Sequence, residues 1–358
     1  MRRFDYSFLA KDTISAEIVN LSIGIGELKT AAAFRKDDYY DIFTHLEAIA
    51  KVQSVKGSNA IEGIISTDKR IEQIVNQNSA PLNHSEMEIA GYRDALNLIH
   101  RAHRQLKIDE DTLLRLHAIM QQYVADPLAG KYKSEDNVIM EVDSEGKRHL
   151  RFEPLSSDEA PIAMRQALVA YREACNDGRI NSLLLIPCFI LDFLCIHPFG
   201  DGNGRISRLL SLLLLYRNDY DVGKYISFEE QINRMKGSYY EALRLSSIGW
   251  HDGKNNYMPF VKNFIATLYL CYKELDKRFA VVQGKRITKE HRIEATILNS
   301  LLPVSKKDIC TLLPDISEST VERVLGSLIK ESKIEKIGSN RSARYIKKNL
   351  VYTNCYSK

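Results

Sequence analysis

The chain has 358 residues, of which 44% are hydrophobic and 27% are charged, and its net charge is +4. Its 18 glycines and 9 prolines are too few for a disordered or collagen-like chain. The length favours two or three domains, each with its own core. No apolar run reaches the roughly 18 residues that a membrane span needs, and the N-terminal residues lack the apolar stretch of a secretory signal.

The cysteines argue against two further classes of protein. None of the six belongs to a Cys-x-x-Cys pair, and several lie inside apolar runs. We therefore expect structural thiols in a cytoplasmic protein, with neither a disulfide framework nor a zinc site.

The first third of the chain is predicted to be helical. Apolar residues recur at three- and four-residue steps through 13–55 and 86–104. Three acidic residues from Asp109 predict the first turn of another helix, whose apolar face includes His117.

The spacing of apolar residues changes from a helical to an alternating pattern between Asn137 and Phe152. Apolar residues alternate with their neighbours up to Val142, turn-forming residues follow at 144–147, and a second short run ends at Phe152. This pattern predicts a lone β-hairpin, which must lie against the helical body because an isolated hairpin has little stability. A surface loop decoration is the alternative.

Helical patterns resume after the hairpin. They cover 157–175, 180–196, 205–217, 228–247 and 257–278. The polar and basic stretch 279–289 is expected to be a linker or the start of a new domain. The stretch 182–196 is the most apolar of the chain, but it is short and carries Pro187 and Asp192. We therefore predict a buried helix there.

The C-terminal residues resemble a winged helix-turn-helix. Three predicted helices precede two short predicted strands, and from Lys285 onward 15 Lys and Arg stand against 8 Asp and Glu. DNA binding would use the helix at 317–330, with phosphate contacts from Arg341, Arg344, Lys347 and Lys348. That helix and its end also carry Glu318, Glu322 and Glu331, which favours a docking or dimerisation module over DNA binding.

One segment carries the strongest chemical signal. From His197 to Arg208 the chain reads His-Pro-Phe-Gly-Asp-Gly-Asn-Gly-Arg-Ile-Ser-Arg, between two apolar helices. Three glycines around Asn203 let backbone N–H groups turn inward, and the next helix adds its positive end. The loop is therefore a candidate phosphate site.

The side chains of this segment fit a nucleotide. Asp201 offers a hard oxygen ligand for Mg²⁺, and Arg205 and Arg208 are suited to phosphate oxygens. His197 can accept a proton from a hydroxyl near neutral pH. A glycine-rich loop alone or a single histidine is more often structural, so the prediction depends on the combination.

The same twelve residues resemble the Fic family signature, His-x-Phe-x-(Asp/Glu)-Gly-Asn-Gly-Arg-x-x-Arg, at every defined position. Supporting similarity extends over roughly 113–264. The resemblance implies a mainly α fold, a Fic-type helical bundle with the hairpin as a flap, beside the C-terminal winged helix-turn-helix. It also implies transfer of AMP from ATP, with Mg²⁺, to a Ser, Thr or Tyr hydroxyl of a target protein, which the edge of the flap would hold by strand addition.

The resemblance implies a role for each matching residue. His197 would be the general base and Asp201 the Mg²⁺ ligand. Lysine replaces Gly204 in members that act as kinases, so the glycine favours AMP transfer. The residues implied in ATP binding are Gly202, Asn203, Gly204, Arg205, Arg208, Tyr239 and Tyr240, although the two tyrosines are equally well explained as core aromatics.

One departure from the family pattern has no role that the sequence reveals. Many members carry Gly-x-x-Arg where this chain has Gly130 to Lys133. Lysine keeps the positive charge but loses the planar fork of arginine.

An upstream segment resembles the family's inhibitory motif, (Ser/Thr)-x-x-x-Glu-(Gly/Asn). Ser58 and Glu62 are four apart on one helical face, and Gly63 follows. Taken alone, the segment is an ordinary helix end with a glycine cap. Beside the signature it implies that Glu62 pairs with Arg208 and blocks the triphosphate, as in members whose inhibitory helix is N-terminal (class II). The same carboxylate could instead position a water that removes AMP.

These patterns predict three domains and one leading function. The domains are an N-terminal helical region with the inhibitory helix (1–105), a Fic core (106–280) and a winged-helix-like domain (285–358). The leading function is an autoinhibited protein adenylyltransferase. The rivals are a signalling or transcriptional adaptor that only binds nucleotide, a de-AMPylating enzyme, and transfer of another phosphate-linked group. The family resemblance also implies a homodimer.

Overall fold

The computed structural model of the chain describes residues 2–142, 148–283, 288–298, 300, 303–339 and 343–348. Over these residues the protein is mainly helical with two small antiparallel sheets, as predicted. The chain divides into two compact units, the first formed by Met1–Thr30 with Ala50–Tyr272, the second by Ala31–Ile49 with Lys273–Lys358.

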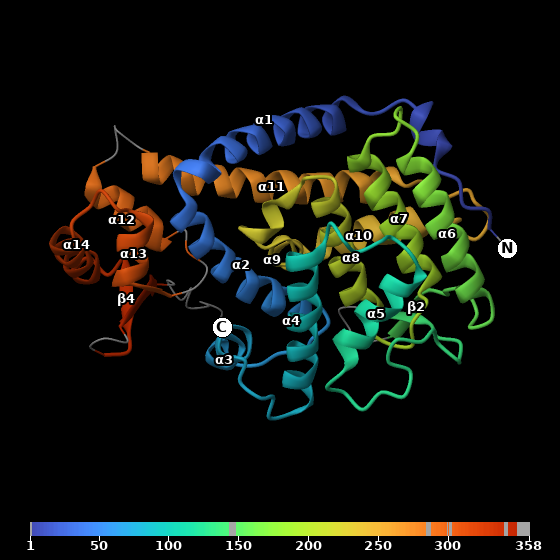
Figure 1. Cartoon of the computed structure of the whole chain (residues 1–358), viewed down its shortest axis with the longest axis horizontal. Coiled ribbons are helices and arrows are strands. Elements are labelled where there is room, and N and C mark those ends of the chain that lie inside the picture. The colour runs from blue at the N-terminus through green and yellow to red at the C-terminus, as the bar shows by residue number, and fades with distance from the viewer. Residues whose placement is uncertain are drawn as a thin grey trace, which may run out of the picture. The chain divides into compact units, whose positions relative to one another are not determined.

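The first unit contains every residue of the candidate site. Its helices are α3 (Asp68–Gln77), α4 (His84–Ala102), α5 (Glu110–Gln121), α6 (Glu159–Cys175), α7 (Ser182–Ile196), α8 (Asn203–Arg217), α9 (Phe228–Arg234) and α10 (Lys236–Ser247), with short 3-10 turns at Ser7–Ala10 and Asp221–Lys224. Helices α1 (Ala16–Asp38), α2 (Tyr40–Ile61) and α11 (Met258–Gln283) contribute residues to both units. Helix α7 packs between α6 and α8, and α8 also contacts α4 (Figure 1).

Helix α7 is the buried helix predicted from the apolar stretch. The Asn181 side chain accepts a hydrogen bond from the Leu183 N–H and caps its start. Asp192 is fully buried on this helix, and it accepts hydrogen bonds from the Tyr6 hydroxyl at 2.8 Å and the Trp250 indole at 2.7 Å. These donors satisfy the carboxylate inside the core, while burial raises its pKa.

Replacing Asp192 with alanine is expected to destabilise the protein by about 3–5 kcal/mol, because buried donors would lose their acceptor and Arg2, 3.6 Å away, its counter-charge. Urea unfolding measures the change. The control is Asp177→Ala, which removes a carboxylate that pairs at the surface with Arg179. Equal unfolding midpoints for the two variants would contradict this account.

The predicted β-hairpin is present. Strands β1 (Ile139–Val142) and β2 (Arg148–Phe152) pair antiparallel, with Met140 opposite Leu150. The turn predicted at 144–147 lies outside the described residues.

The second unit contains the three helices and the two strands predicted at the C-terminus. These are α12 (Lys289–Leu298), α13 (Lys306–Leu312), α14 (Glu318–Lys330), β4 (Ile334–Ile337) and β5 (Arg344–Lys347). A further strand, β3 (Val304–Ser305), completes a sheet of order β3-β5-β4 and was not predicted, because two residues show no periodicity. Whether this module is a winged helix-turn-helix stays a prediction.

Other boundaries differ from the predictions. The region 228–247 is two helices rather than one, because Met235 leaves the helical conformation between α9 and α10. Helix α11 continues to Gln283, so the linker predicted from residue 279 begins too early. No helix among the described residues is long and apolar enough to cross a bilayer.

Candidate functional site

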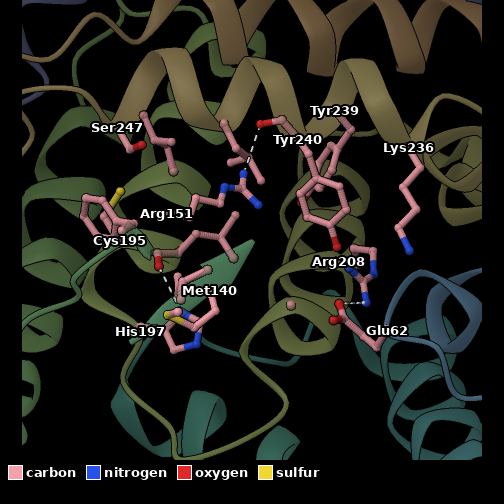
Figure 2. A pocket seen from close by; sticks show the side chains of 16 residues that line it. Glu62, Met140, Arg151, Cys195, His197, Arg208, Lys236, Tyr239, Tyr240 and Ser247 are labelled. Carbon is pink, nitrogen blue, oxygen red and sulfur yellow. Dashed lines mark hydrogen bonds and ion pairs between the residues drawn. The ribbon is translucent and has the colours of Figure 1, made fainter. Parts of the chain in front are cut away.

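A cavity of about 540 Å³ opens in the first unit beside the predicted signature segment. Its walls come from the end of α2, the hairpin, α7, α8 and α10 (Figure 2). The cavity is lined by Glu62, Ile139, Met140, Arg151, Phe152, Leu191, Leu194, Cys195, His197, Gly204, Arg208, Lys236, Tyr239, Tyr240, Leu243 and Ser247. Six residues predicted from the sequence are therefore brought together, namely Glu62, His197, Gly204, Arg208, Tyr239 and Tyr240.

His197 ends α7 in a left-handed conformation with φ of 52°. A non-glycine residue in this conformation stores on the order of 1 kcal/mol of strain and is held there by its surroundings. The ring Nδ1 lies 3.2 Å from the Leu194 carbonyl oxygen, which can only accept, so Nδ1 carries the proton. Nε2 is therefore the ring nitrogen that is free to take up a proton.

Burial lowers the pKa of His197 to about 4. The unfolded chain takes up this proton near pH 6.5, so the folded state loses stability as the pH falls from about 6.5 to about 4. We expect the His197 ring resonances of the free protein to stay at their neutral positions from pH 8 down to about pH 5. NMR titration, with the signal assigned by its loss in His197→Gln, measures this, and a midpoint near 6.5 would contradict it.

The loop after His197 is fixed by its own side chains. The Asn203 amide donates to the Phe199 carbonyl at 2.8 Å and accepts from the Phe199 N–H at 3.0 Å. Gly202 has φ of 79°, a left-handed conformation that favours glycine, and a Cβ there would also displace the end of the Met120 side chain, 2.4 Å away. Gly202 also precedes α8 without a capping side chain, which leaves the first-turn N–H groups for an anion.

His117 packs against this loop and bonds to it, a role that was not predicted from the sequence. Its ring stacks on Phe199 with centroids 3.9 Å apart. Nδ1 accepts from the Gly130 N–H at 3.0 Å, so Nε2–H is the donor to the Asp201 carbonyl at 3.2 Å. A histidine on the apolar face of a predicted helix was the available signal.

Asp201 and Arg205 lie outside the cavity lining. Arg205 is buried, with ion pairs to Asp201 at 2.8 Å and to Glu88 at 3.0 Å, so its guanidinium orients the loop carboxylate. The Asp201 side chain is 70% exposed beside the start of α8. A single accessible carboxylate next to an anion-binding loop fits Mg²⁺, which usually takes one or two carboxylates together with substrate phosphates. The described residues contain no cluster of three or more acidic, His or Cys side chains that could hold a metal ion.

Arg208 is held by the end of α2. Its Nε donates to the Ser58 hydroxyl at 2.8 Å, and its Nη2 donates to the Ser58 carbonyl at 3.0 Å. Nη2 also donates to Glu62 Oε1 at 2.8 Å (Figure 2). Burial acts to lower the pKa of Arg208, but the pairing with Glu62 and the neighbouring tyrosines outweigh it, so the net pKa is raised above its usual value. Gly204 makes room for this pair, because a Cβ there would lie 2.3 Å from Glu62 Oε1.

A glycine-terminated helix end places Glu62. The Gly63 N–H donates to the Ala60 carbonyl and the Ile64 N–H to the Asn59 carbonyl, with Gly63 at φ of 79°. These two bonds form a Schellman arrangement at the glycine cap that the sequence predicted.

Two cations of the cavity were not predicted. Lys236 Nζ donates to the Ile61 carbonyl at 2.6 Å and so fastens the end of α2. Arg151, on β2, donates to the Tyr240 carbonyl at 3.0 Å and lies 4.8 Å from the centroid of its ring. Neither role could be predicted from a local sequence motif, because the groups that the two side chains contact are distant in the chain.

The two tyrosines predicted near the adenine differ in exposure. Tyr239 is buried and Tyr240 is half-buried, and their rings meet edge to face with centroids 5.5 Å apart. Burial raises the pKa of both hydroxyls. Both line the cavity, although Tyr239 also packs against Phe260 as a core aromatic would.

Known structures share this fold. A Fic family protein from Desulfovibrio desulfuricans G20 is similar, with a TM-score of 0.61, 22% identity, and coverage of 94% of this chain and 97% of that one. A Fic domain containing signalling protein from Bacteroides thetaiotaomicron VPI-5482 has a TM-score of 0.55 and 21% identity, covering 73% of this chain and 96% of that one. Fic-1 from C. elegans, as a fragment, has a TM-score of 0.50 and 18% identity, covering 73% and 71%.

Of two comparisons made at the level of sequence, one finds a match, and it agrees with these structural similarities. No curated protein sequence matches the chain significantly. Residues 107–215 match the sequence model of the Fic/DOC family, and this range includes the whole segment from His197 to Arg208. The chain therefore carries a Fic/DOC family domain over residues 107–215.

Proposed function

We propose that the chain is a protein adenylyltransferase that moves AMP from ATP to a hydroxyl group of a protein. The observation that carries the proposal is that a neutral imidazole and a buried guanidinium line one cavity, with the start of α8 beside them. Fic family domains commonly transfer nucleotide groups, which supports the same conclusion.

The proposed reaction assigns one task to each part of the site. The attacking hydroxyl oxygen bonds to the α-phosphorus while its proton passes to Nε2 of His197, and the bond to pyrophosphate breaks. The first-turn N–H groups of α8 stabilise the charge that develops on the phosphate oxygens. Mg²⁺, held by Asp201, would neutralise charge on the phosphates.

We propose further that Glu62 inhibits this reaction. Arg208 is a cavity cation that the family resemblance implies in ATP binding, and in this structure its Nη2 is bound to Glu62. A carboxylate and a phosphate cannot occupy the same place on one guanidinium, so productive ATP binding requires Glu62 to leave.

Removal of AMP is a second candidate function. The Glu62 side chain is 34% exposed and lines the same cavity as His197. It can therefore accept a hydrogen bond from a water that attacks an AMP-modified side chain.

The test uses ATP labelled at the α- or the γ-phosphate, incubated with the chain, its Glu62→Gly variant and a cell lysate. AMP transfer predicts covalent protein label from the α-position only. Label from the γ-position would indicate phosphoryl transfer, and no covalent label from either would leave a nucleotide-binding adaptor. Loss of label from an AMP-modified protein on adding the unsubstituted chain, but not Glu62→Gly, would identify removal of AMP.

For the module at 285–358 we favour protein docking over DNA binding. Lys306 forms ion pairs with Glu318 and Glu322 at 2.7 and 2.6 Å, and Arg323 pairs with Glu290 at 2.8 Å. These two basic side chains near α14 are thus already matched by acids, which weakens their attraction to phosphates. Arg341 lies outside the described residues. Salt-dependent binding of the full chain to duplex DNA would overturn this preference, and homodimerisation stays a prediction.

A further inference from the structure

Lys133 is a buried cation at the base of the hairpin. Its residue is only 4% exposed, and burial lowers the pKa of its ammonium group. Nζ donates to Asn137 Oδ1 at 2.8 Å and to the Leu155 carbonyl at 2.6 Å. Asn137 lies just before β1 and Leu155 just after β2, so one ammonium group joins the two ends of the hairpin.

The same two residues also hold the loop that carries the imidazole. The Lys133 N–H donates to the Pro198 carbonyl at 2.9 Å. The Asn137 amide donates to the Phe199 carbonyl at 3.3 Å. The loop after His197 is therefore bound to the base of the hairpin through the side chains of Lys133 and Asn137 and through the backbone N–H of Lys133.

The loop beneath this junction is itself rigid. Tyr132 stacks on Phe199 with centroids 6.0 Å apart, on a ring that His117 also covers. The Gly130 N–H bonds to His117, as described above. Lys133 is thus attached to a packed loop through its backbone, while its ammonium group bonds just before β1 and just after β2.

We propose that Lys133 is a positioning residue that sets the hairpin in register with His197, so that a protein segment on the hairpin presents its hydroxyl at the imidazole. This role rests on the proposed function of the site. Lysine suits it because the two acceptors belong to separate chain segments, which a tetrahedral ammonium group reaches more readily than a planar fork.

The charge of Lys133 also acts on His197. Burial is the main cause of the lowered pKa of His197, and Lys133 lowers it further, whereas the Leu194 carbonyl, Glu62 and Asp201 raise it. Removing the ammonium group therefore shifts the His197 pKa upward, and restoring a cation shifts it back.

The experiment compares Lys133→Met and Lys133→Arg with Lys131→Met, a substitution of an exposed lysine in the same loop. Backbone hydrogen exchange is measured in the full chain without nucleotide. Lys133→Met should speed exchange at 138–142 and 148–152 by about tenfold relative to Lys131→Met, and leave α7 and α8 unchanged. The His197 titration midpoint should rise in Lys133→Met and return toward its original value in Lys133→Arg.

The outcomes separate this inference from the proposed function. Unchanged exchange in the hairpin, or acceleration spread equally through α7 and α8, would overturn the positioning role. In the Glu62→Gly background, Lys133→Met should lower automodification from ATP about tenfold with ATP affinity unchanged. If no variant, Glu62→Gly included, transfers label, the proposed function fails while the exchange result still decides the role of Lys133.

Discussion

The Glu62→Gly protein should lose AMP transfer by about 10²–10⁴-fold when His197 is also replaced with alanine, which is the usual contribution of a general base. Nε2 is the ring nitrogen left without a proton, because Nδ1 faces the Leu194 carbonyl. The lowered pKa keeps the ring neutral at physiological pH, so the base is present in its active form. Rates of label incorporation from α-labelled ATP measure the loss.

ATP binding should survive this substitution. The predicted phosphate contacts come from the first-turn N–H groups of α8 and from the Arg208 side chain, not from the imidazole. Calorimetry should therefore give ATP affinities within about threefold for Glu62→Gly with and without His197→Ala. His251→Ala is the matched control, since that ring bonds to the Glu153 carbonyl outside the cavity lining. Retained transfer in the His197 variant would remove the proposed base.

Replacing Glu62 with glycine should raise automodification by an order of magnitude or more. Arg208 would lose its carboxylate partner and become available to a phosphate, and about 1.4 kcal/mol of relief corresponds to tenfold. Label incorporation from α-labelled ATP is compared between the chain and the variant at equal protein concentration.

Two controls separate release of Arg208 from a general loosening of the protein. Glu241→Ala removes a surface carboxylate that pairs with Arg244 and should leave the rate unchanged. Ser58→Ala removes the other side-chain acceptor of Arg208 and should raise the rate less than Glu62→Gly, because the ion pair remains. A Glu62→Gly protein no more active than the unsubstituted chain would end the inhibition proposal.

The main features of the site were predictable because they are local. The apolar helix α7, the glycine-rich loop and the start of α8 follow one another in the chain, so spacing alone places His197 and Gly202 in one loop. The helix end at Glu62 was likewise predictable from Gly63, which follows it. What brings that end to Arg208 is packing over a long sequence separation, and only the family resemblance anticipated it.

Other residues could not be predicted because their partners are far apart in the chain. The family pattern implied phosphate contacts for Arg205, yet its guanidinium pairs with Glu88, which belongs to a helix with no motif. Lys236 is an ordinary surface lysine in sequence, and its bond to the Ile61 carbonyl depends on the tertiary fold. Lys133 was a departure from the family pattern with no role that the sequence revealed, and its bonds to both ends of the hairpin support the proposed one.

Glu62 follows directly after the last residue of α2, and this position has a kinetic consequence. Lys236 and the glycine cap fasten the backbone at this helix end, whereas the Glu62 side chain is 34% exposed and can change rotamer without unfolding the helix. Its carboxylate can therefore leave Arg208 repeatedly during one catalytic cycle, so the resting protein should show slow basal activity rather than none. An activating partner would then need only to prolong the time that the Glu62 carboxylate spends away from Arg208.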